Sequence, residues 1–354
     1  MSSQRIRFCT ADDGVRIAYA VAGSGPALVR APHWLTHIEH DWGTPVRRHW
    51  LDELSRNNTL VRFDPRGCGL SDRDPGEVSF ERWVDDLHCV VHAAGLERFA
   101  LFGPSQGGAV AIAYAARHPE RVSRLILFGA FGRGKLKRGA GASVEDAMLQ
   151  LKLVELGWDS DDPTYRQVFA SQMMPSGSVE AMRSLAQMMR LSASAASAAR
   201  LIRMFYEIDV SAIAGRVRCP TLVFHARGDT RVPHEEGRLL ASKIPGARFV
   251  TLQTVNHMLP AEDAEWPRFV AEMHAFLADD RAGEALEGLS VREREVLEQL
   301  ATGMDNAQIG ARLGMSEKTV RNHLTRIFEK MQVHHRGEAI VRAREAGLGA
   351  SQPR

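Results

Sequence analysis

One serine in the sequence stands in a pattern that is typical of a nucleophile. Ser105 is the centre of a Gly-Pro-Ser-Gln-Gly run at residues 103–107, which follows the apolar run FALFG and precedes a helical pattern that ends at Arg117. A strand that turns directly into a helix leaves no room for Cβ atoms beside the turn, so glycines are required there. The turn would expose the Ser105 hydroxyl beside a helix N-terminus. There the N–H of Gln106 could stabilise negative charge on a carbonyl oxygen under attack.

A base and a carboxylate that could activate this serine follow later in the chain. A serine hydroxyl is a weak nucleophile at neutral pH until a base takes its proton and an acid orients that base. Asp229 follows the apolar run TLVFHA, and His257 follows the run RFVTLQ. His225 lies within a strand pattern and His274 within a helical one, so neither suits a base on a loop. The other position for the acid, GAFGRG after LILFG, contains no carboxylate. An ordinary helix N-cap is the alternative interpretation of Ser105.

The elements that must position these residues are indicated by the first 278 residues. Short apolar runs alternate with helical patterns there, which favours an α/β domain with a largely parallel sheet between helices. The Asp-Gly pair at 13–14 predicts a hairpin. Eight strands are expected: Arg5 to Thr10, Val15 to Ala22, Ala27 to Arg30, Thr59 to Asp64, Phe99 to Gly103, Leu125 to Gly129, Thr221 to Ala226 and Arg248 to Gln253. A mostly helical insertion at residues 133–215 is expected to cover the sheet as a lid.

These motifs, together with the run DPRGCGLSD at residues 64–72, resemble the α/β-hydrolase superfamily along residues 5–278. The fold class expected is therefore an α/β-hydrolase fold. The resemblance implies five residues of catalytic machinery: Ser105 as nucleophile, Asp229 as acid, His257 as base, and Gln106 and Trp34 as donors of an oxyanion hole through their backbone N–H groups. Pro32-His33 stands where the family usually has His-Gly, so the oxyanion loop, and turnover with it, is expected to differ.

The ligand expected at this site is small and largely apolar. The insertion is rich in methionine, whose flexible thioether adapts to irregular apolar shapes, although packing within the lid is an equal alternative. The methionines concerned are Met173, Met174, Met182, Met188, Met189 and Met204. No metal or cofactor is predicted. Three histidines and an acid that could suggest a metal lie on one loop without fixed geometry: His33, His37, His40 and Asp41.

The last sixty residues carry a second set of motifs, in which short helices follow one another. Four helices are expected: Val291 to Thr302, Ala307 to Leu313, Ser316 to Met331, and Arg336 to Ala346. Gly314 breaks the chain between the second and third, and Ser316 can cap the third, as a helix-turn-helix requires. The third helix has an apolar stripe of Val320, Leu324, Ile327, Phe328 and Met331.

The opposite face of the third helix carries groups that suit a nucleic acid. Between residues 311 and 344 there are eight Lys or Arg and three Asp or Glu, whereas the whole chain carries a net charge of +2. The basic charge is therefore concentrated where a phosphate backbone would lie. Six side chains on this face or its flanks could bind phosphates or base edges: Lys318, Arg321, Asn322, Thr325, Arg326 and Lys330.

The segment from Leu289 to Ile340 resembles the LuxR/FixJ-type helix-turn-helix along its full length. This resemblance implies that Arg321, Asn322 and Thr325 reach bases, that Lys318, Thr319 and Lys330 approach phosphates, and that the last helix forms a dimer contact. Family members often have Lys or Arg where this chain has Thr325, so a different operator sequence is expected. A solvated basic helix without a DNA role is the alternative interpretation.

Length and composition agree with two domains, because 354 residues exceed the usual size of one hydrophobic core. The boundaries expected are a hydrolase-like domain at 1–278, a linker at 279–288 and an all-helical DNA-binding domain at 289–354. The sequence has no signal-like N-terminus and no run of about 18 apolar residues, so we expect a cytoplasmic protein without membrane contact, nucleoid-associated when DNA-bound.

The two halves together suggest a regulator that senses its ligand. We expect a homodimer that binds double-stranded promoter or operator DNA and responds to an ester, lactone or amide in the pocket, with slow hydrolysis of that signal. The other hypothesis is an active serine esterase or amidase with an auxiliary DNA-binding tail. A purely scaffolding role would leave both the triad and the basic helix without use.

Overall fold

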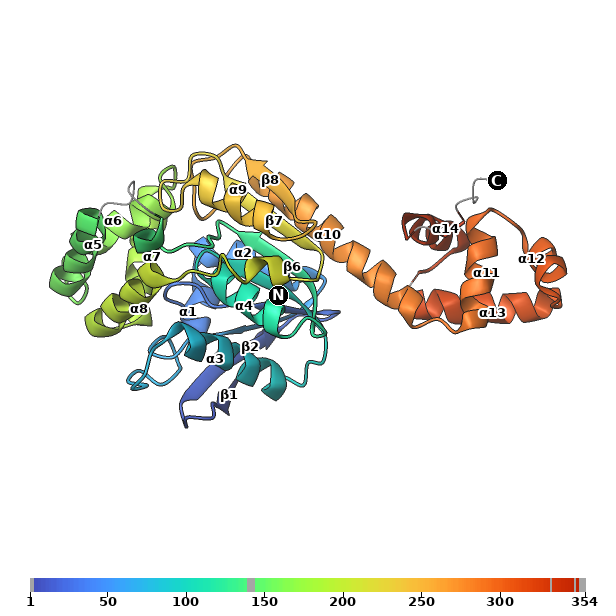
Figure 1. The fold of residues 1–354 in the computed structure, drawn as a ribbon, viewed down its shortest axis with the longest axis horizontal. Helices are drawn as coiled ribbons and strands as arrows, with labels where there is room; N and C mark the ends of the chain where they lie inside the picture. Colours follow the sequence, from blue (N-terminus) through green and yellow to red (C-terminus); the bar gives the residue numbers. More distant parts are fainter. Residues whose placement is uncertain (1–2, 139–143, 332, 347, 350–354) are drawn as a thin grey trace. The chain divides into compact units, whose positions relative to one another are not determined.

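The computed structural model describes residues 3–138, 144–331, 333–346 and 348–349, and the side chains of residues 279–287 and 345 fall outside this description. The chain divides into two units, residues 1–271 and 272–354 (Figure 1). The division falls within one helix, α10 (Trp266–Glu287). Residues 279–287, expected as most of the linker, continue α10, and their burial is not described. The expected domain boundaries therefore stay predictions.

The sheet of the first unit has eight strands. They are β1 (Arg5–Thr10), β2 (Arg16–Ala22), β3 (Ala27–Arg30), β4 (Thr59–Phe63), β5 (Phe99–Pro104), β6 (Val122–Phe128), β7 (Thr221–Ala226) and β8 (Arg248–Leu252). Their order is β1-β2-β4-β3-β5-β6-β7-β8, and β2 pairs antiparallel with both β1 and β4 while the remaining pairs are parallel. The predicted fold class is confirmed, including the hairpin at residues 13–14.

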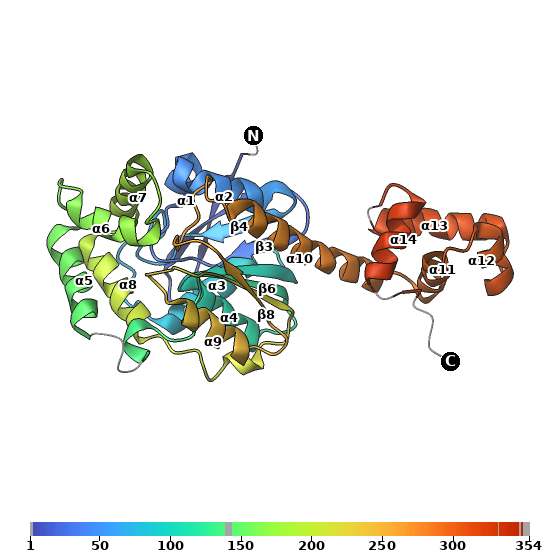
Figure 2. The same ribbon diagram turned by 90° about the horizontal axis from the view of Figure 1, so that it is seen from above.

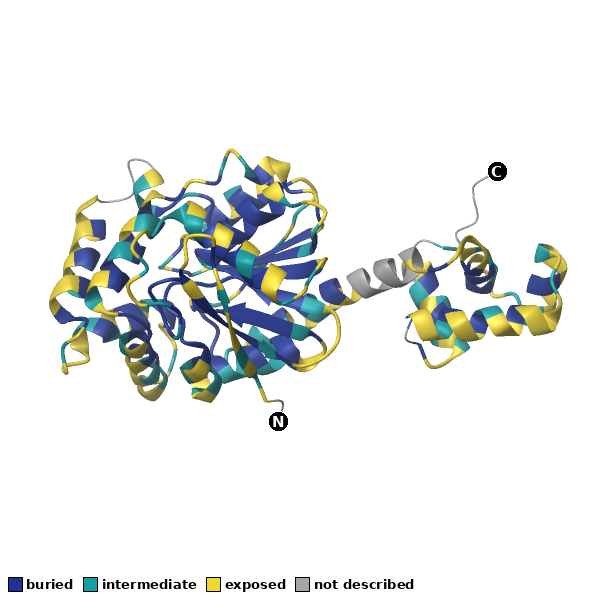
Figure 3. Cartoon of the chain, turned by 90° about the horizontal axis from the view of Figure 1, so that it is seen from below, coloured by how far each residue is buried: buried dark blue, intermediate teal, exposed yellow. Residues whose placement is uncertain are grey.

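Burial follows from position in the sheet. Every residue of the central strands β5 and β7 is buried, because parallel strands are covered on both faces. The edge strand β1 is largely exposed. Figure 3 shows this contrast as dark strands inside helices whose outer faces are exposed. The carboxyl ends of β3, β5, β7 and β8 meet at one edge of the sheet, where loops can bring distant residues together.

Helices cover both faces of the sheet. One face carries α2 (Pro45–Arg56) and the start of α10, and the other carries α3 (Phe80–Ala93), α4 (Gly107–Arg117) and α9 (His234–Lys243) (Figure 2). On the first face the ring of Trp50 lies 4.9 Å from that of Phe128 and 4.8 Å from that of Phe269, measured between centroids. This aromatic cluster holds α2 against the sheet directly behind the site described below.

The segment between β6 and β7 forms the helical lid. It contains α5 (Val144–Gly157), α6 (Thr164–Met173), α7 (Val179–Ser192) and α8 (Ala195–Glu207), which gather at one end of the unit (Figure 1). The same segment contains two short helices, η1 (Lys135–Lys137) before α5 and η2 (Ala214–Arg216) after α8. Another short helix, α1 (Ile38–Gly43), follows β3. The indole N–H of Trp158 donates to Ala193 O at 2.9 Å and so ties the segment after α5 to the junction between α7 and α8. Within the described residues, no helix combines the length and apolar character needed to cross a membrane.

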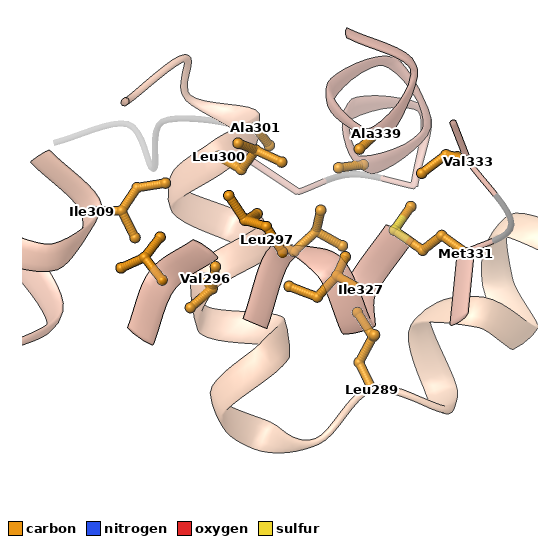
Figure 4. Close-up of a cluster of buried hydrophobic side chains, with 13 residues drawn as sticks. Leu289, Val296, Leu297, Leu300, Ala301, Ile309, Ile327, Met331, Val333 and Ala339 are labelled. Carbon is orange, nitrogen blue, oxygen red and sulfur yellow. The ribbon is translucent and has the colours of Figure 1, made fainter. Parts of the chain in front are cut away.

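Beyond α10, the described part of the second unit contains four helices around a core of its own. They are α11 (Val291–Ala301), α12 (Asn306–Leu313), α13 (Glu317–Met331) and α14 (Arg336–Glu345). Figure 4 shows the core, which includes Val296, Leu297, Leu300, Ile309 and Ile327, all fully buried. Gly314 ends α12 in the left-handed conformation at φ +67°, as the expected break between helices requires.

One acidic residue joins two helices of this unit. Glu293 accepts hydrogen bonds from the N–H of Ser290 at 2.8 Å and from Lys330 Nζ at 2.6 Å, while the Ser290 hydroxyl caps the N–H of Glu293. The Glu293 side chain is 4% exposed. The hydrogen bond from Lys330 and the bond from the Ser290 backbone lower the pKa of Glu293 to about 2. The start of α11 is thereby fastened to the end of α13.

We predict that Glu293→Gln lowers the free energy of unfolding of this unit by about 1 to 2 kcal/mol at pH 7, because a charge-assisted cap and ion pair are lost. The folded-state pKa lies below the ordinary value of 4.5, so this stabilisation is complete above about pH 4.5 and is lost as pH falls toward about 2. Amide hydrogen exchange of α11 and α13 in the full chain measures the effect. Glu295→Gln is the matched control, because Glu295 pairs with Arg292 at the exposed surface. Equal protection in the two variants would contradict the assignment.

Candidate functional site

Ser105 lies in a strained turn between β5 and α4. Its φ is +51°, a left-handed conformation that residues with side chains rarely adopt. The N–H of Ser105 donates to Phe128 O at 2.8 Å, and its carbonyl accepts from Gly108 N–H at 3.0 Å. These bonds fix the turn on both sides, so the hydroxyl is presented at the edge of the sheet as the sequence predicted for this motif.

Glycines clear the space that this turn needs. A Cβ on Gly107 would lie 2.4 Å from Pro32 O, and one on Gly103 would lie 2.8 Å from the Cα of Gly108. Gly108, which the motif does not include, is equally constrained, because its Cβ would lie 2.4 Å from that of Ala130. The turn therefore fits only with three glycines around the serine.

The structure brings Ser105, His257 and Asp229 into one chain of hydrogen bonds. Ser105 Oγ lies 3.0 Å from His257 Nε2, and His257 Nδ1 lies 2.6 Å from Asp229 Oδ2. An ionised carboxylate only accepts hydrogen bonds, so Nδ1 carries the proton and Nε2 is free to accept from the serine hydroxyl. This is the arrangement in which the imidazole can remove the serine proton.

Asp229 is fixed in its ionised form. Burial alone would raise the pKa of Asp229. The attraction to His257 and the hydrogen bonds from His257 and from the Val232 N–H outweigh burial, so the pKa of Asp229 lies below its ordinary value. Oδ1 accepts from the N–H of Arg231 at 2.8 Å and of Val232 at 2.9 Å. Oδ2 also lies 3.7 Å from His225 Nε2, which donates to Val232 O. His225 thus contacts the acid from within β7, while His257 alone reaches Ser105 Oγ among the described histidines.

The loop that carries His257 is tied to the lid. Asn256, which sequence reasoning did not single out, donates from Nδ2 to Ser176 Oγ at 2.6 Å, and its Oδ1 accepts from Ser176 N–H at 3.1 Å. The N–H of Met258 donates to Met173 O at 2.9 Å. A displacement of α6 would therefore act directly on the position of His257.

The loop after β3 contains a strained residue, Leu35, two positions after His33, which stands where the family usually has glycine. Leu35 has φ +59°, and it and Ser105 are the described non-glycine residues with positive φ. Trp34 is 3% exposed, and its ring lies 5.5 Å from that of Trp158 and 5.4 Å from that of Phe169. The backbone N–H groups of Trp34 and Gln106 donate to no other residue in the described part of the chain. Both are therefore available to a ligand at Ser105.

The buried Asp64 carboxylate holds this loop through hydrogen bonds. Its carboxylate accepts from the Thr36 hydroxyl at 2.6 Å, from the N–H of Ile38 and from the N–H of Leu70. A Cβ at Gly69 would lie 1.9 Å from Asp64 Oδ2, so the glycine of the 64–72 run is required by this contact. Burial raises the pKa of Asp64 to about 6. The run recognised in the sequence thus positions the loop that carries Trp34.

Two cavities reach Ser105. The outer cavity has a volume of about 180 Å³ and is bounded by the lid, Trp34, Gln106 and the loop at residues 230–232. The inner cavity has a volume of about 40 Å³ and also reaches His257 and Met258. Ser105, Gln106, Trp34 and Met173 belong to the walls of both.

The outer cavity has a more polar lining than the expectation of a largely apolar ligand suggested, and that expectation stays a prediction. Three cations line it: Lys135, Arg138 and Arg231. Lys135 pairs with Asp146, and Arg231 donates to Gln150 at 2.7 Å and to Gln172 at 3.1 Å. Of the methionines considered above, Met173 lines this cavity, while Met188 and Met189 are buried within the lid. The sequence analysis did not predict these cations, because they come from segments outside the methionine-rich helices.

The residues considered for a metal have separate partners. His33 lies 3.1 Å from Arg30 Nη2, His37 caps α1, and Asp41 lies 3.6 Å from Arg62. Among the described residues, no three His, Cys, Asp or Glu side chains are grouped as metal ligands would be.

The seven DNA-facing residues predicted on and beside α13 are exposed. Arg321 pairs with Glu317 at 3.0 Å, and the Thr325 hydroxyl donates back to Arg321 O at 3.1 Å. Thr319 shares its hydroxyl with Ser316, whose Oγ also caps the helix at 3.1 Å, as predicted. These contacts are within one helix and leave the outer face accessible.

Lys330 has partners within its own unit. Its ammonium pairs with Glu293 and also donates to Gly288 O at 3.2 Å, so a phosphate would compete with a buried carboxylate. Lys318 is exposed at the first turn of α13, and the phosphate contacts expected of both lysines stay predictions. Val341 on α14 is 54% exposed, and the dimer contact there stays a prediction.

Comparisons with known proteins match both units. Residues 47–264 match the family "Serine aminopeptidase, S33", and residues 287–343 match "Bacterial regulatory proteins, luxR family". The chain is 26% identical over 273 residues to a pyrrolizixenacetamide deacetylase of Xenorhabdus hominickii, covering 75% of this chain and 96% of that protein. It is 28% identical over 246 residues to a 2-hydroxymuconate semialdehyde hydrolase of Pseudomonas putida, covering 64% and 79%.

A solved structure gives the same picture of the fold. The esterase RhEst1 from Rhodococcus sp. ECU1013 is 26% identical with a TM-score of 0.62, covering 77% of this chain and 98% of that one. The chain therefore belongs to the serine aminopeptidase S33 family of α/β hydrolases, and it carries a DNA-binding domain of the bacterial regulatory LuxR family at its C-terminal end.

Proposed function

We propose that this protein is a transcriptional regulator whose hydrolase unit binds, and cleaves through Ser105, an ester, lactone or amide ligand. The observation that carries the proposal is the hydrogen-bonded chain from Ser105 through His257 to Asp229, with distances of 3.0 and 2.6 Å. A serine that only capped a helix would need neither a strained backbone nor an oriented imidazole beside its hydroxyl.

The reaction assigned to this geometry is acyl transfer in two steps. His257 Nε2 takes the proton of Ser105 as Oγ attacks the carbonyl carbon, and Asp229 stabilises the imidazolium that forms. The imidazolium then gives its proton to the departing alcohol or amine, which leaves an ester on Ser105. Water, deprotonated by the same nitrogen, attacks this ester, and the serine recovers its proton as the acid departs.

The negative charge of each tetrahedral intermediate falls on the former carbonyl oxygen. The N–H groups of Gln106 and Trp34 are the donors assigned to it, because both are without a protein acceptor and both residues line the cavities at Ser105. The hydrogen bonds from Thr36 and Ile38 to Asp64 hold the Trp34 loop in place against the backbone strain at Leu35.

Relatives of the chain support this class of reaction. The proteins similar to it include one named a deacetylase and one named an esterase, whose names denote cleavage of bonds to acyl groups. The LuxR-family domain supports a role at DNA, with Arg321, Asn322 and Thr325 assigned to base edges and Lys318, Thr319 and Arg326 to the backbone. We further propose that the protein binds its operator as a homodimer.

The second candidate is an active serine esterase or amidase whose tail only localises it. The complete hydrogen-bonded chain at Ser105 favours turnover in either case. The two candidates differ in whether DNA binding responds to the state of Ser105.

We predict that a fluorophosphonate probe labels the purified protein at Ser105, and that Ser105→Ala abolishes labelling and ester turnover. Asp229→Asn should slow both on the order of 10³-fold or more, because the imidazole is then held in the wrong tautomer. Mass spectrometry of the labelled peptide and a nitrophenyl ester assay measure these effects.

Ser171→Ala is the control, since that hydroxyl is exposed on α6 and donates within its own helix. A folded wild-type protein that takes up no label, or label that persists in Ser105→Ala, would remove Ser105 as the nucleophile.

For the DNA-binding unit, we predict that Arg321→Ala weakens binding to the preferred site by about 1 to 3 kcal/mol and binding to unrelated DNA much less. Lys318→Ala should weaken all sequences alike and reduce the salt slope by about one ion. Mobility-shift titrations at several salt concentrations measure both, on a site selected by the full-length protein from random-sequence DNA.

Lys243→Ala is the matched control, because it removes one exposed positive charge from the hydrolase unit. If Arg321→Ala and Lys318→Ala lose the same affinity on every sequence, the assignment of Arg321 to a base is wrong.

A further inference from the structure

The inner cavity beside Ser105 has a charged wall that the reaction itself does not need. Arg30, at the end of β3, and Arg47, on α2, line it together with His33, Ser105 and His257. Arg30 is 7% exposed and Arg47 is 5% exposed. Neither arginine belongs to the proposed triad or to the oxyanion donors, so their burial at this point requires a separate explanation.

The charge around this wall is not balanced by protein carboxylates. A third buried arginine, Arg62, lies 3.6 Å from Asp41 and also donates to Gln4 Oε1. The charge of Asp41 also acts on Arg30 and Arg47, but burial outweighs it and the pKa of both arginines is lowered. A second buried carboxylate nearby, Asp64, accepts from Thr36, Ile38 and Leu70. Three guanidinium groups therefore face two carboxylates, and neither carboxylate lines the inner cavity.

The buried polar side-chain atoms of this wall that have no hydrogen-bond partner are all donors. The guanidinium of Arg47 makes no hydrogen bond to another described residue, and Nε of both Arg30 and Arg47 is buried without a partner. His33 Nδ1 lies 3.1 Å from Arg30 Nη2, and guanidinium can only donate, so Nδ1 accepts and the proton of His33 is on Nε2. That N–H is also buried without a partner. Burial and the neighbouring arginines lower the pKa of His33 well below its ordinary value, which keeps this tautomer neutral.

An unpaired guanidinium in such a place is costly for the folded protein. Burial lowers the pKa of Arg30 to about 9 and also lowers that of Arg47. An anion with acceptor oxygens would satisfy the donors and offset the buried charge, and arginine is the side chain best shaped for a carboxylate.

The size of the cavity limits what the anion can be. A volume of about 40 Å³ holds roughly three heavy atoms, at about 10 to 15 Å³ for each water-sized group. A terminal carboxylate has three, so this group alone fills the inner cavity, and the carbons that join it to the scissile carbonyl lie at Ser105, where the two cavities meet. The larger group on the other side of the scissile carbonyl would then occupy the outer cavity of about 180 Å³.

We propose that the inner cavity binds a carboxylate on the acyl arm of the substrate through Arg47, with Arg30 and His33, so that the enzyme acts on half-esters or half-amides of short dicarboxylic acids. This inference rests on the proposed function, because it names the substrate class of the same site. It also replaces the apolar ligand expected from the sequence.

The first test compares two esters that differ in charge at the end of the acyl arm. Monobenzyl succinate carries the carboxylate, and benzyl 4-methylpentanoate has an isopropyl group of similar shape in its place. The benzyl group is too large for the inner cavity and directs the acyl arm into it. We expect wild-type kcat/KM to favour the succinate about 10- to 100-fold, as a buried charge-assisted hydrogen bond would give.

Variants of neighbouring arginines locate the preference. Arg47→Gln should reduce the ratio to one or below, and Arg47→Lys should restore part of it. Arg48→Gln is the matched control, because Arg48 is the next residue of α2 but pairs with Asp52 and lies over the Trp42 ring. Arg48→Gln should keep the wild-type ratio. A wild-type ratio near one, or a preference that survives Arg47→Gln but is lost in Arg138→Gln, would overturn the assignment to the inner cavity.

Calorimetric binding to Ser105→Ala separates this inference from the proposed function. We expect monobenzyl succinate to bind Ser105→Ala at least 10-fold more tightly than the neutral ester, and the difference to vanish in the double variant with Arg47→Gln. Arg47-dependent binding without wild-type turnover supports the carboxylate site and contradicts the hydrolase. Turnover without charge preference supports the hydrolase and contradicts the carboxylate site.

Discussion

The backbone of Ser105 sets the conditions that the surrounding structure must meet. A non-glycine residue at φ +51° is sustained only where the packing around it leaves no relaxed alternative. Gly103, Gly107 and Gly108 allow β5, α4 and the Pro32 carbonyl to approach this closely. Gly129 does the same for His257, because a Cβ there would lie 3.0 Å from the His257 ring. The turn therefore fixes where Ser105, His257 and the Trp34 loop can meet.

The electrostatic character of the site follows from which groups surround this turn. Asp229 is matched by His257 and two backbone N–H groups, and Asp64 by three donors. Within the described residues neither Arg30 nor Arg47 forms an ion pair with a carboxylate, although the charge of Asp41 acts on both. The outer cavity adds Arg138 and Arg231. The site therefore presents more positive charge than its own carboxylates neutralise. This excess is the property by which the protein would recognise an anionic ligand.

The sequence predicted the parts of this protein that depend on local pattern. The Gly-x-Ser-x-Gly turn, the eight strands and the helix-turn-helix each combine residue types and spacing that few other structures satisfy, and the structure brings Ser105, Asp229 and His257 within hydrogen-bonding distance. The positive charge of the site was missed, because Arg30 and Arg47 lie apart in the sequence and meet only through the fold of β3 against α2. A charged residue ending the apolar run ALVR was the available signal. The pairing of Lys330 with Glu293 was likewise not predicted, because the two residues lie 37 positions apart.

The proposal that one chain joins acyl chemistry to gene control can be tested by a single comparison of DNA affinity. The full-length protein would be titrated onto its selected DNA site before and after stoichiometric labelling of Ser105 by a fluorophosphonate, with Ser105→Ala exposed to the same reagent as control. A coupled regulator should change its affinity by about 10-fold or more on labelling, with no change in Ser105→Ala. Equal affinity of labelled and unlabelled protein would contradict the coupling and leave an esterase that happens to bind DNA.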